Sequence, residues 1–393
     1  MGTINIDRIN KLKVYELGER PIELIYPRYK NIKIKDNYLV DSNNKKQGTK
    51  GDMYHKYIMD YILKNGCFDN NPRPKYHDFY ENAYYDKESE CIITKDRGSI
   101  KVFPAEEVFE TDLGVELISP AHTLSVNNGI ECSYDLSKGE SPLITLRPIY
   151  TKGSIAEMLW IYQKESNDLV EFDKLLDKNT WDEDKKINNW WKDWAITDSD
   201  GYYILNEFNH PTIGSCYGES VRKRHMLKKE VIEQLKNNPD GRRNISSLWQ
   251  VDDFNDPHGL KPCAFLTIWN IRHDWDKKDY LDMTLIQRSS DFGTAGCINQ
   301  VQYVALQKMV ARELNLTPGY FTWKPINVQI YDRHIENAIE MLNRTPINGK
   351  CNIELNKKVK KFNEVTKDDI TIEDYPKELI KTKNPQLTFE LGI

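Results

Sequence analysis

The stretch Ala264-Phe-Leu-Thr-Ile-Trp-Asn-Ile271 is the part of the chain that decides the fold. Its apolar, β-branched and aromatic residues predict a strand, and Tyr280-Leu-Asp-Met-Thr-Leu-Ile286 predicts a second one. A long helix is expected at about 300–314, followed by a strand at 327–331 and a helix at 333–343. Because these strands and helices mix without a regular βαβ repeat, the pattern predicts an α+β fold.

The segments before this centre divide into three parts. Residues 1–50 alternate short apolar runs with Lys, Asn and Asp, which predicts short strands or an appended arm. Apolar residues at helical spacing predict a helix at 53–64, which Asn65-Gly66 ends. Residues 67–118 are rich in Tyr, Asp, Asn and Glu around a strand-like run at 91–94, and this composition indicates an insertion.

Three further elements complete the expected secondary structure. Glu157–Gln163 predicts a strongly apolar helix, and 226–235 predicts an amphipathic one. The last apolar run, 387–391, predicts a strand at the C-terminus.

Composition excludes several classes of protein. The 393 residues are 39% hydrophobic and 29% charged, which is enough apolar side chain for a large core. A net charge of −5 argues against a dedicated nucleic-acid binder. No apolar run is long enough for a membrane span, and the first 30 residues lack a signal-peptide core, so we expect a cytoplasmic protein. None of the seven cysteines forms a CxxC pair, which argues against a disulfide scaffold or a structural zinc site.

Cys263 is the cysteine that best suits a nucleophile. It follows Pro262 at the start of the first predicted core strand, and a thiolate there needs positive charge nearby. Arg288 and Ser289, at the end of the next strand, are a pair that suits an anion. The alternatives are a buried cysteine that acts only as a small hydrophobe and a surface turn with a solvated arginine.

Other polar residues have two interpretations each. Arg242 and Arg243 are adjacent on a turn, so both reach one phosphate only in a special geometry or from a partner chain; otherwise they are surface charge. The basic run 222–229 is a solvated helix face or a nucleic-acid contact. Asn299, expected at the start of the long helix, either caps it or reads a uracil edge, which requires a group that donates and accepts at once.

Together, eight stretches in this order resemble thymidylate synthase, in particular the subgroup from low-GC Gram-positive bacteria and their phages. The matching stretches are Pro120–Ser125, Glu157–Gln163, Gly214–Gly218, Asp240–Arg243, Leu260–Cys263, Gln287–Asp291, Gly296–Asn299 and Ile330–Asn337. The resemblance covers about 53–72 and 119–393. It implies that family's fold, with a large mixed sheet and flanking helices. It also implies an N-terminal extension at 1–52 and a catalytic domain at 53–393, with the insertion at about 74–118.

The resemblance implies reductive methylation of dUMP to dTMP with 5,10-methylenetetrahydrofolate as co-substrate and no metal. Cys263 would be the nucleophile that adds to C6 of the pyrimidine. Glu157 would be the general acid–base that works through ordered water, with Tyr217 beside that water. Asp291 would hold the folate pterin.

The other implied site residues belong to the nucleotide or to the folate. The nucleotide side would comprise Arg73, Arg288, Ser289, Asn299, Gln329 and Tyr331 of one subunit, with Arg242 and Arg243 crossing from the partner in a homodimer. The folate side would comprise Arg147, Trp191, Trp194, Leu260, Asp291 and the C-terminal Ile393.

Departures from the family pattern keep two rival functions open. Ala264 replaces a His that follows the nucleophile in many members, Gln329 stands where the family has a ribose-binding His, and 295–297 replace the usual Gly-Leu-Pro near the folate. One rival is a phage-type dUMP hydroxymethylase, in which water instead of hydride traps the methylene. The other is a non-catalytic homologue that binds nucleic acid through 222–229.

Overall fold

A seven-stranded sheet forms the centre of the protein, and β14 (Ala264–His273) and β15 (Asp279–Asp291) lie in its middle. The strand order is β13-β14-β15-β16-β11-β4, and β12 pairs with β16 (Thr317–Tyr331). β15 and β16 run parallel, whereas the other neighbouring strands run antiparallel. The sheet is therefore mixed, and the expected α+β class is confirmed.

The structure is a computed structural model that describes residues 31–69, 75–89, 91–94, 98–101, 107–255 and 260–389. Its helices are α3 (Lys50–Asn65), α4 (Thr151–Met158), α5 (Leu169–Leu175), α6 (Trp181–Asp184), α7 (Gly218–Arg224), α8 (Gln234–Asn237), α9 (Gly296–Leu314), α10 (Ile335–Asn343) and α11 (Lys377–Lys383). The strands outside the centre are β1 (Ile34–Lys35), β2 (Tyr38–Val40), β3 (Lys46–Gln47), β4 (Cys67–Phe68), β5 (Lys75–Glu81), β6 (Ala83–Asp86), β7 (Cys91–Thr94), β8 (Gly98–Lys101), β9 (Glu107–Thr111), β10 (Gly114–Pro120), β11 (Thr123–Asn127), β12 (Cys132–Asp135), β13 (Ile245–Ser247), β17 (Asn352–Leu355) and β18 (Ile370–Glu373).

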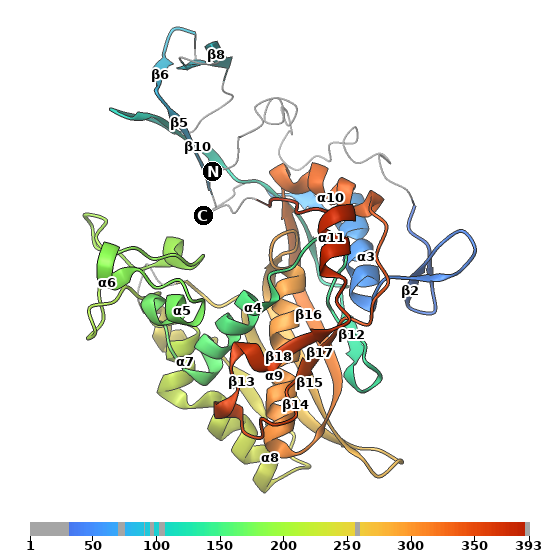
Figure 1. Cartoon of the computed structure of the whole chain (residues 1–393). Coiled ribbons are helices and arrows are strands. Elements are labelled where there is room, and N and C mark those ends of the chain that lie inside the picture. The colour runs from blue at the N-terminus through green and yellow to red at the C-terminus, as the bar shows by residue number, and fades with distance from the viewer. Residues whose placement is uncertain are drawn as a thin grey trace.

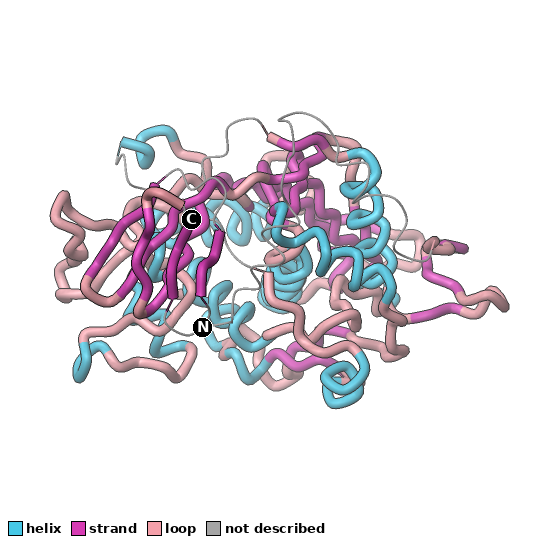
Figure 2. The backbone as a smooth tube through the Cα atoms, turned by 90° about the horizontal axis from the view of Figure 1, so that it is seen from above, coloured by secondary structure: helices cyan, strands magenta, loops and turns pink. Residues whose placement is uncertain are grey.

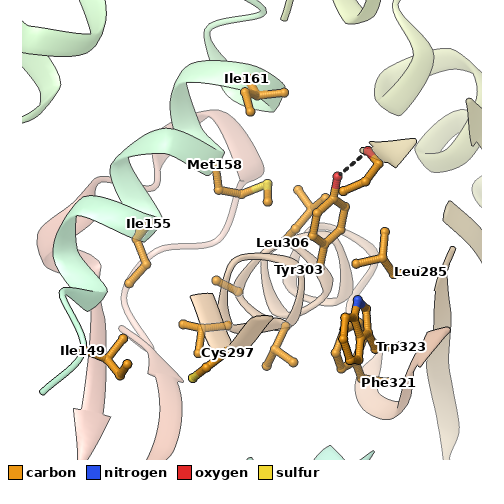
Figure 3. Packing of buried hydrophobic residues seen from close by; sticks show 14 of the residues in the cluster. Ile149, Ile155, Met158, Ile161, Leu285, Cys297, Tyr303, Leu306, Phe321 and Trp323 are labelled. Carbon is orange, nitrogen blue, oxygen red and sulfur yellow. Dashed lines mark hydrogen bonds between the residues drawn. The ribbon is translucent and has the colours of Figure 1, made fainter. Parts of the chain in front are cut away.

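The helix α9 connects the two parallel strands and packs against them and against α4 (Figure 1). Figure 3 shows its side chains Tyr303 and Leu306 meeting Leu285 and Trp323 from the sheet, while Met158 approaches from α4. All five side chains are buried. The apolar runs that predicted the central strands and the 157–163 helix thus share one core. This core fixes the position of the carboxyl end of β15.

The start of α3 is held by a buried carboxylate. Thr49 and Asp52 form a reciprocal capping box, and Asp52 also accepts hydrogen bonds from the backbone and the hydroxyl of Thr145. Burial raises the pKa of Asp52, while these hydrogen bonds oppose the rise. The predicted helix at 53–64 is confirmed, and it begins three residues earlier than expected because of this cap.

Several boundaries differ from the prediction. The long helix begins at Gly296 with Ala295 as its cap, so Asn299 lies inside the first turn and is not the capping residue. The expected strand at 327–331 is the end of the fifteen-residue β16. The predicted amphipathic helix at 226–235 corresponds to a π-helical turn at Lys228–Glu233 and the short α8.

The predicted strand at 387–391 is wrong for the residues that the structure describes. Residues 387–389 have no regular secondary structure, and 390 and 391 lie outside the described ranges. The Phe389 ring packs edge-on against His334 and lies where a side chain at Gly293 would stand. Side-chain packing therefore holds this segment in place of strand pairing.

The insertion forms a small separate unit. β5, β10 and β9 form one antiparallel sheet, and β6, β7 and β8 form another. Ile92, Val115 and Leu117 make its own buried cluster. Figure 1 shows this unit projecting from the main body, and the view in Figure 2 separates its strands from those of the central sheet. The strand expected at 91–94 is confirmed as β7.

The insertion is attached to the main body beside the end of β16. Arg333 makes two hydrogen bonds to the Asp78 carboxylate, at 2.8 and 2.6 Å, and its guanidinium carbon lies 3.7 Å from the centre of the Tyr76 ring. The Tyr76 hydroxyl donates to Asp332 at 2.6 Å. Both members of the Arg333–Asp78 pair are largely buried, at 12% and 4% side-chain exposure.

We expect Asp78→Ala to loosen the attachment of the insertion, because it leaves a buried guanidinium without its carboxylate. Losing one partner of a buried pair costs about 3–5 kcal/mol, so hydrogen-exchange protection of the β5 and β10 amides should fall by roughly a hundredfold or more. Exchange followed by mass spectrometry measures this. Asp368→Ala removes a comparable but exposed pair with Lys152 and should leave these amides unchanged. Equal exchange in the two variants would contradict the assignment.

Candidate active site

Cys263 lies directly before β14, and both sides of its peptide are held. Its backbone N–H donates to the Tyr217 hydroxyl at 3.0 Å, and its carbonyl accepts from the Arg288 backbone N–H at 2.9 Å. The Arg288 guanidinium donates to the carbonyls of Pro262 at 2.9 Å and Lys261 at 2.6 Å. The predicted nucleophile and the predicted anion-binding arginine are therefore neighbours.

The charge state of the Cys263 thiol depends on two opposing effects. Burial raises its pKa, while the Arg288 guanidinium lowers it. In this structure burial is the larger effect. Arg288 acts in the direction that the sequence suggested, but it does not by itself bring the thiol pKa below its ordinary value, so a reactive thiolate requires additional positive charge.

Glu157, at the end of α4, is a buried carboxyl group ringed by donors. The Trp190 indole donates to its Oε2 at 2.7 Å. Burial raises the pKa of Glu157 to about 7, and interactions with Trp190, Gln302 and Trp191 oppose that rise. A carboxyl with a pKa near neutrality exchanges protons readily in both directions, which suits a general acid–base.

Two hydrogen-bond donors near Glu157 have no acceptor at normal geometry among the described residues. Gln302 Nε2 and Trp191 Nε1 are buried, and neither makes a hydrogen bond of normal geometry within the described residues. Both lie near enough to Glu157 to lower its pKa. Trp190 and Gln302 were not among the predicted site residues. For Trp190 the cluster of indoles at 181–194 was a signal, but for Gln302 the sequence offered none.

Asp291 ends β15 in a second group of open polar atoms. Burial raises its pKa, while His334, Thr294 and Arg147 oppose the rise. Its Oδ2 atom, Thr294 Oγ1 and Arg147 Nε are buried without hydrogen-bond partners among the described residues. Such atoms are costly unless a ligand or water satisfies them, which indicates a polar binding site here.

Arg147 is more buried than we expect for a residue that would contact the solvent-exposed tail of a folate. It is 5% exposed, and its Nη2 donates to the carbonyls of Gly293 at 3.0 Å and Thr294 at 3.1 Å. Its guanidinium carbon lies 5.2 Å from the centre of the Phe389 ring. Arg147 therefore holds the turn after Asp291 and the C-terminal segment together.

The end of β16 brings Gln329 and Tyr331 to the same edge of the sheet. Gln329 is the register partner of Asp291, and its carbonyl accepts from the Phe292 N–H at 2.8 Å. Tyr331 is buried and packs edge-on against Tyr76 and His334. Ser289 lies two residues before Asp291 on β15. These predicted nucleotide residues are thus near neighbours in the sheet.

The remaining predicted residues divide into three groups. Trp191 is buried against Tyr217 and Trp194, and Leu260 packs on the core. Arg242 and Arg243 are exposed on the turn after α8. Arg73 and Ile393 lie outside the described residues.

The basic run at 222–229 is largely neutralised. Arg222 pairs with Glu219, Arg224 with Asp253, and Lys228 with Glu165. These pairs leave little free positive charge on the helix face, which disfavours the nucleic-acid interpretation.

The described residues contain no group of three or more His, Cys, Asp or Glu side chains placed to hold a metal ion. None of their helices combines the length and apolar character needed to cross a bilayer.

Comparisons with known proteins agree on one family. The family model described as thymidylate synthase matches residues 119–385. Thymidylate synthases of Streptococcus pneumoniae are 36% identical over 346 residues, which is 88% of this chain and 100% of theirs, and one from Lactococcus lactis is 35% identical over the same length. The solved structure of thermostable thymidylate synthase A from Bacillus subtilis superposes with a TM-score of 0.61 at 25% identity, covering 87% of this chain and 99% of that one.

We expect the raised pKa of Glu157 to appear in the pH dependence of stability. Its carboxyl has a pKa of about 7 when folded, against 4.5 as the ordinary value. The folded state therefore prefers the protonated form, and stability is lost as pH rises from about 4.5 to about 7. Glu157→Gln removes this loss, so the variant should gain about 3 kcal/mol on the wild type between pH 4.5 and pH 8.

Urea unfolding at several pH values measures this gain. Glu183→Gln, at an exposed carboxylate, should leave the wild-type pH dependence unchanged. A constant difference between Glu157→Gln and the wild type at all pH values would contradict a raised pKa.

Proposed function

The chain belongs to the thymidylate synthase family of methyltransferases, and on that premise we propose that it converts dUMP to dTMP at a site built around Cys263. The observation that carries the proposal is that Arg288 and Tyr217 hold the Cys263 peptide from both sides. This fixes the sulfur beside the cation that binds the nucleotide phosphate. Preorganised charge and orientation of this kind supply much of the catalytic effect in enzymes.

Each part of the nucleotide has a matching group. Arg288 and Ser289 would bind the phosphate, and Arg242 and Arg243 of a second subunit would add to them. Asn299 would read the uracil edge, while Gln329 and Tyr331 would bind the ribose. Arg242 and Arg243 of a second subunit would bring further guanidinium groups toward Cys263, and these would supply the positive charge that Arg288 alone lacks.

The chemistry requires a thiolate and a proton carrier. The Cys263 sulfur would add to C6 of the pyrimidine, which makes C5 nucleophilic toward the methylene of 5,10-methylenetetrahydrofolate. Glu157, with a pKa near 7, would take up and return protons on the base side. Tyr217 has its pKa raised by burial, so its hydroxyl stays protonated and serves as a donor.

The folate site is supported by the open atoms around Asp291. A carboxylate oxygen and a threonine hydroxyl without partners suit the N–H groups of a pterin. Trp191 belongs to the main core and Trp194 and Leu260 pack on it, and these three side chains would provide the apolar surface for the folate. No metal enters the proposal.

We also propose the division of the chain into an extension at 1–52 and a catalytic domain at 53–393 that carries the insertion at about 74–118. The separate cluster of Ile92, Val115 and Leu117 supports treating the insertion as an added unit.

Formation of dihydrofolate from dUMP and 5,10-methylenetetrahydrofolate, followed by absorbance, tests the proposed function. The hydroxymethylase alternative would consume dUMP without producing dihydrofolate. The indoles of Trp190 and Trp191 around Glu157 favour a site that excludes water at this step.

We expect Cys263→Ala to abolish turnover while dUMP binding persists, because the phosphate, base and ribose contacts come from other residues. Absorbance measures turnover, and titration calorimetry measures dUMP binding. Cys67→Ala changes an exposed cysteine of β4 that is not among the proposed site residues; it is the control and should retain full activity. Full activity of Cys263→Ala would refute the role of this sulfur, as would covalent trapping of 5-fluoro-dUMP on another cysteine.

We expect mixtures of two inactive variants to regain activity if sites are shared between subunits. Cys263→Ala supplies intact arginines, and Arg243→Ala supplies an intact thiol. In a hybrid dimer one site receives both, so random exchange of subunits should restore about a quarter of the wild-type sites. The control is Cys263→Ala mixed with Cys263→Ala/Arg243→Ala, which should stay inactive. No recovery in a verified hybrid would contradict an intersubunit arginine.

A further inference from the structure

A continuous row of side chains connects the sheet to Glu157. The Trp323 indole donates to Gln287 Oε1 at 2.9 Å, Gln287 Nε2 donates to Asn299 Oδ1 at 3.0 Å, and Asn299 Nδ2 donates to Gln302 Oε1 at 3.1 Å. Gln302 Nε2 is the last donor and lies near the Glu157 carboxyl. The row runs from β16 through β15 to the first two turns of α9.

The direction of this row follows from its ends. An indole N–H can only donate, so Gln287 must turn its oxygen to Trp323 and its nitrogen to Asn299. Asn299 must then turn its oxygen to Gln287 and its nitrogen to Gln302. At the far end, Gln302 presents its nitrogen to a carboxyl group, which accepts. Reversing Asn299 alone would place two donors together at Gln287 and two acceptors together at Gln302.

This arrangement leaves Asn299 with the pattern that uracil needs. Its amide nitrogen has a second hydrogen, and its oxygen has a second lone pair. These complement the O4 acceptor and the N3–H donor of uracil. Cytosine presents a donor and an acceptor in the opposite order, so it would require the reversed amide.

Resting on the proposed function, we propose that Gln302 is a positioning residue that holds the Asn299 amide in its uracil-reading orientation and ties it to Glu157. Gln302 is 3% exposed, and its Nε2 makes no hydrogen bond of normal geometry within the described residues. A buried N–H in that state costs free energy. Its placement toward Glu157 accounts for a glutamine at this position of a helix that is otherwise largely apolar on its buried face.

Few ionisable groups of the described residues face Glu157. Tyr217 and Tyr303 interact with it electrostatically, and burial raises the pKa of both, so they remain neutral. The other contacts are the uncharged donors of Trp190, Trp191 and Gln302. Loss of the Gln302 donor should therefore raise the pKa of Glu157, because none of these neighbouring groups carries a charge that would offset the loss.

The test compares two methionine substitutions on the same helix. Gln302→Met removes the hydrogen bond from Asn299 and the donor that faces Glu157, at similar volume. Gln300→Met is the matched control, because Gln300 is equally buried but bonds to Tyr134 and to the Gly296 carbonyl. We expect Gln302→Met to weaken dUMP binding relative to dCMP by about tenfold, the value of one hydrogen bond, and to raise the pH at which Glu157 titrates in the rate profile. Gln300→Met should change neither quantity.

Gln302→Glu separates the two functions of the side chain. A carboxylate keeps an acceptor toward Asn299 but offers no donor to Glu157. We expect this variant to retain the preference for dUMP over dCMP while its pH profile moves further than that of Gln302→Met. Circular dichroism establishes that each variant is folded.

Binding and turnover are measured separately so that the outcomes remain distinct. Wild-type protein that makes no dihydrofolate from dUMP would refute the proposed function. The binding preference of wild type and variants, from calorimetry, still tests the role of Gln302. If Gln302→Met keeps both the dUMP preference and the pH profile of Gln300→Met, the inference is wrong.

Discussion

The hydrogen bonds between Arg288 and the segment 261–263 are the constraint on which the site depends. β14 and β15 are antiparallel neighbours, and their register places Ala264 opposite Gln287. Arg288 extends that pairing beyond the strand by binding three successive carbonyls with its backbone and guanidinium. One residue thus fixes the loop that carries the sulfur and supplies the nearest positive charge. A thiol on an unconstrained loop would have neither property.

Burial gives the site residues their chemical properties, but it lowers stability. The rest of the protein must offset this loss of stability. Burial raises the pKa of Cys263, Glu157 and Asp291, and several donors and acceptors around them lack partners. Each of these features costs stability in the absence of ligands. The apolar core between α4, α9 and the sheet, to which Met158, Tyr303 and Trp323 belong, compensates for this cost.

The sequence predicted the parts of this arrangement that follow local rules. The strands at 264–271 and 280–286 and the helix at 53–64 have clear periodicity, and the structure confirms them. Gln302 could not be found in this way, and for Trp190 the only signal was the cluster of indoles, because the roles of both arise from contacts between distant segments. The predicted strand at 387–391 was wrong for the described residues 387–389 for a related reason: an apolar run predicted a strand, whereas the Phe389 ring occupies the space beside Gly293. The capping interpretation of Asn299 was also wrong, since Ala295 is the N-cap of α9 and the helix begins at Gly296.

The position of Asn299 inside α9 explains why that boundary matters. A capping asparagine uses its side-chain oxygen on its own helix and has little left for a ligand. One turn further along, the same amide projects from the helix and is free to bond outward. Residue 302 follows at i+3 on the same face, so the helix geometry itself brings Gln302 beside Asn299. Tyr303, at i+4, continues that face into the core, where its hydroxyl donates to the Ala264 carbonyl at 3.3 Å. A single helical face thereby joins Asn299, which we propose reads the base, the Gln302 donor beside Glu157 and the strand that follows Cys263.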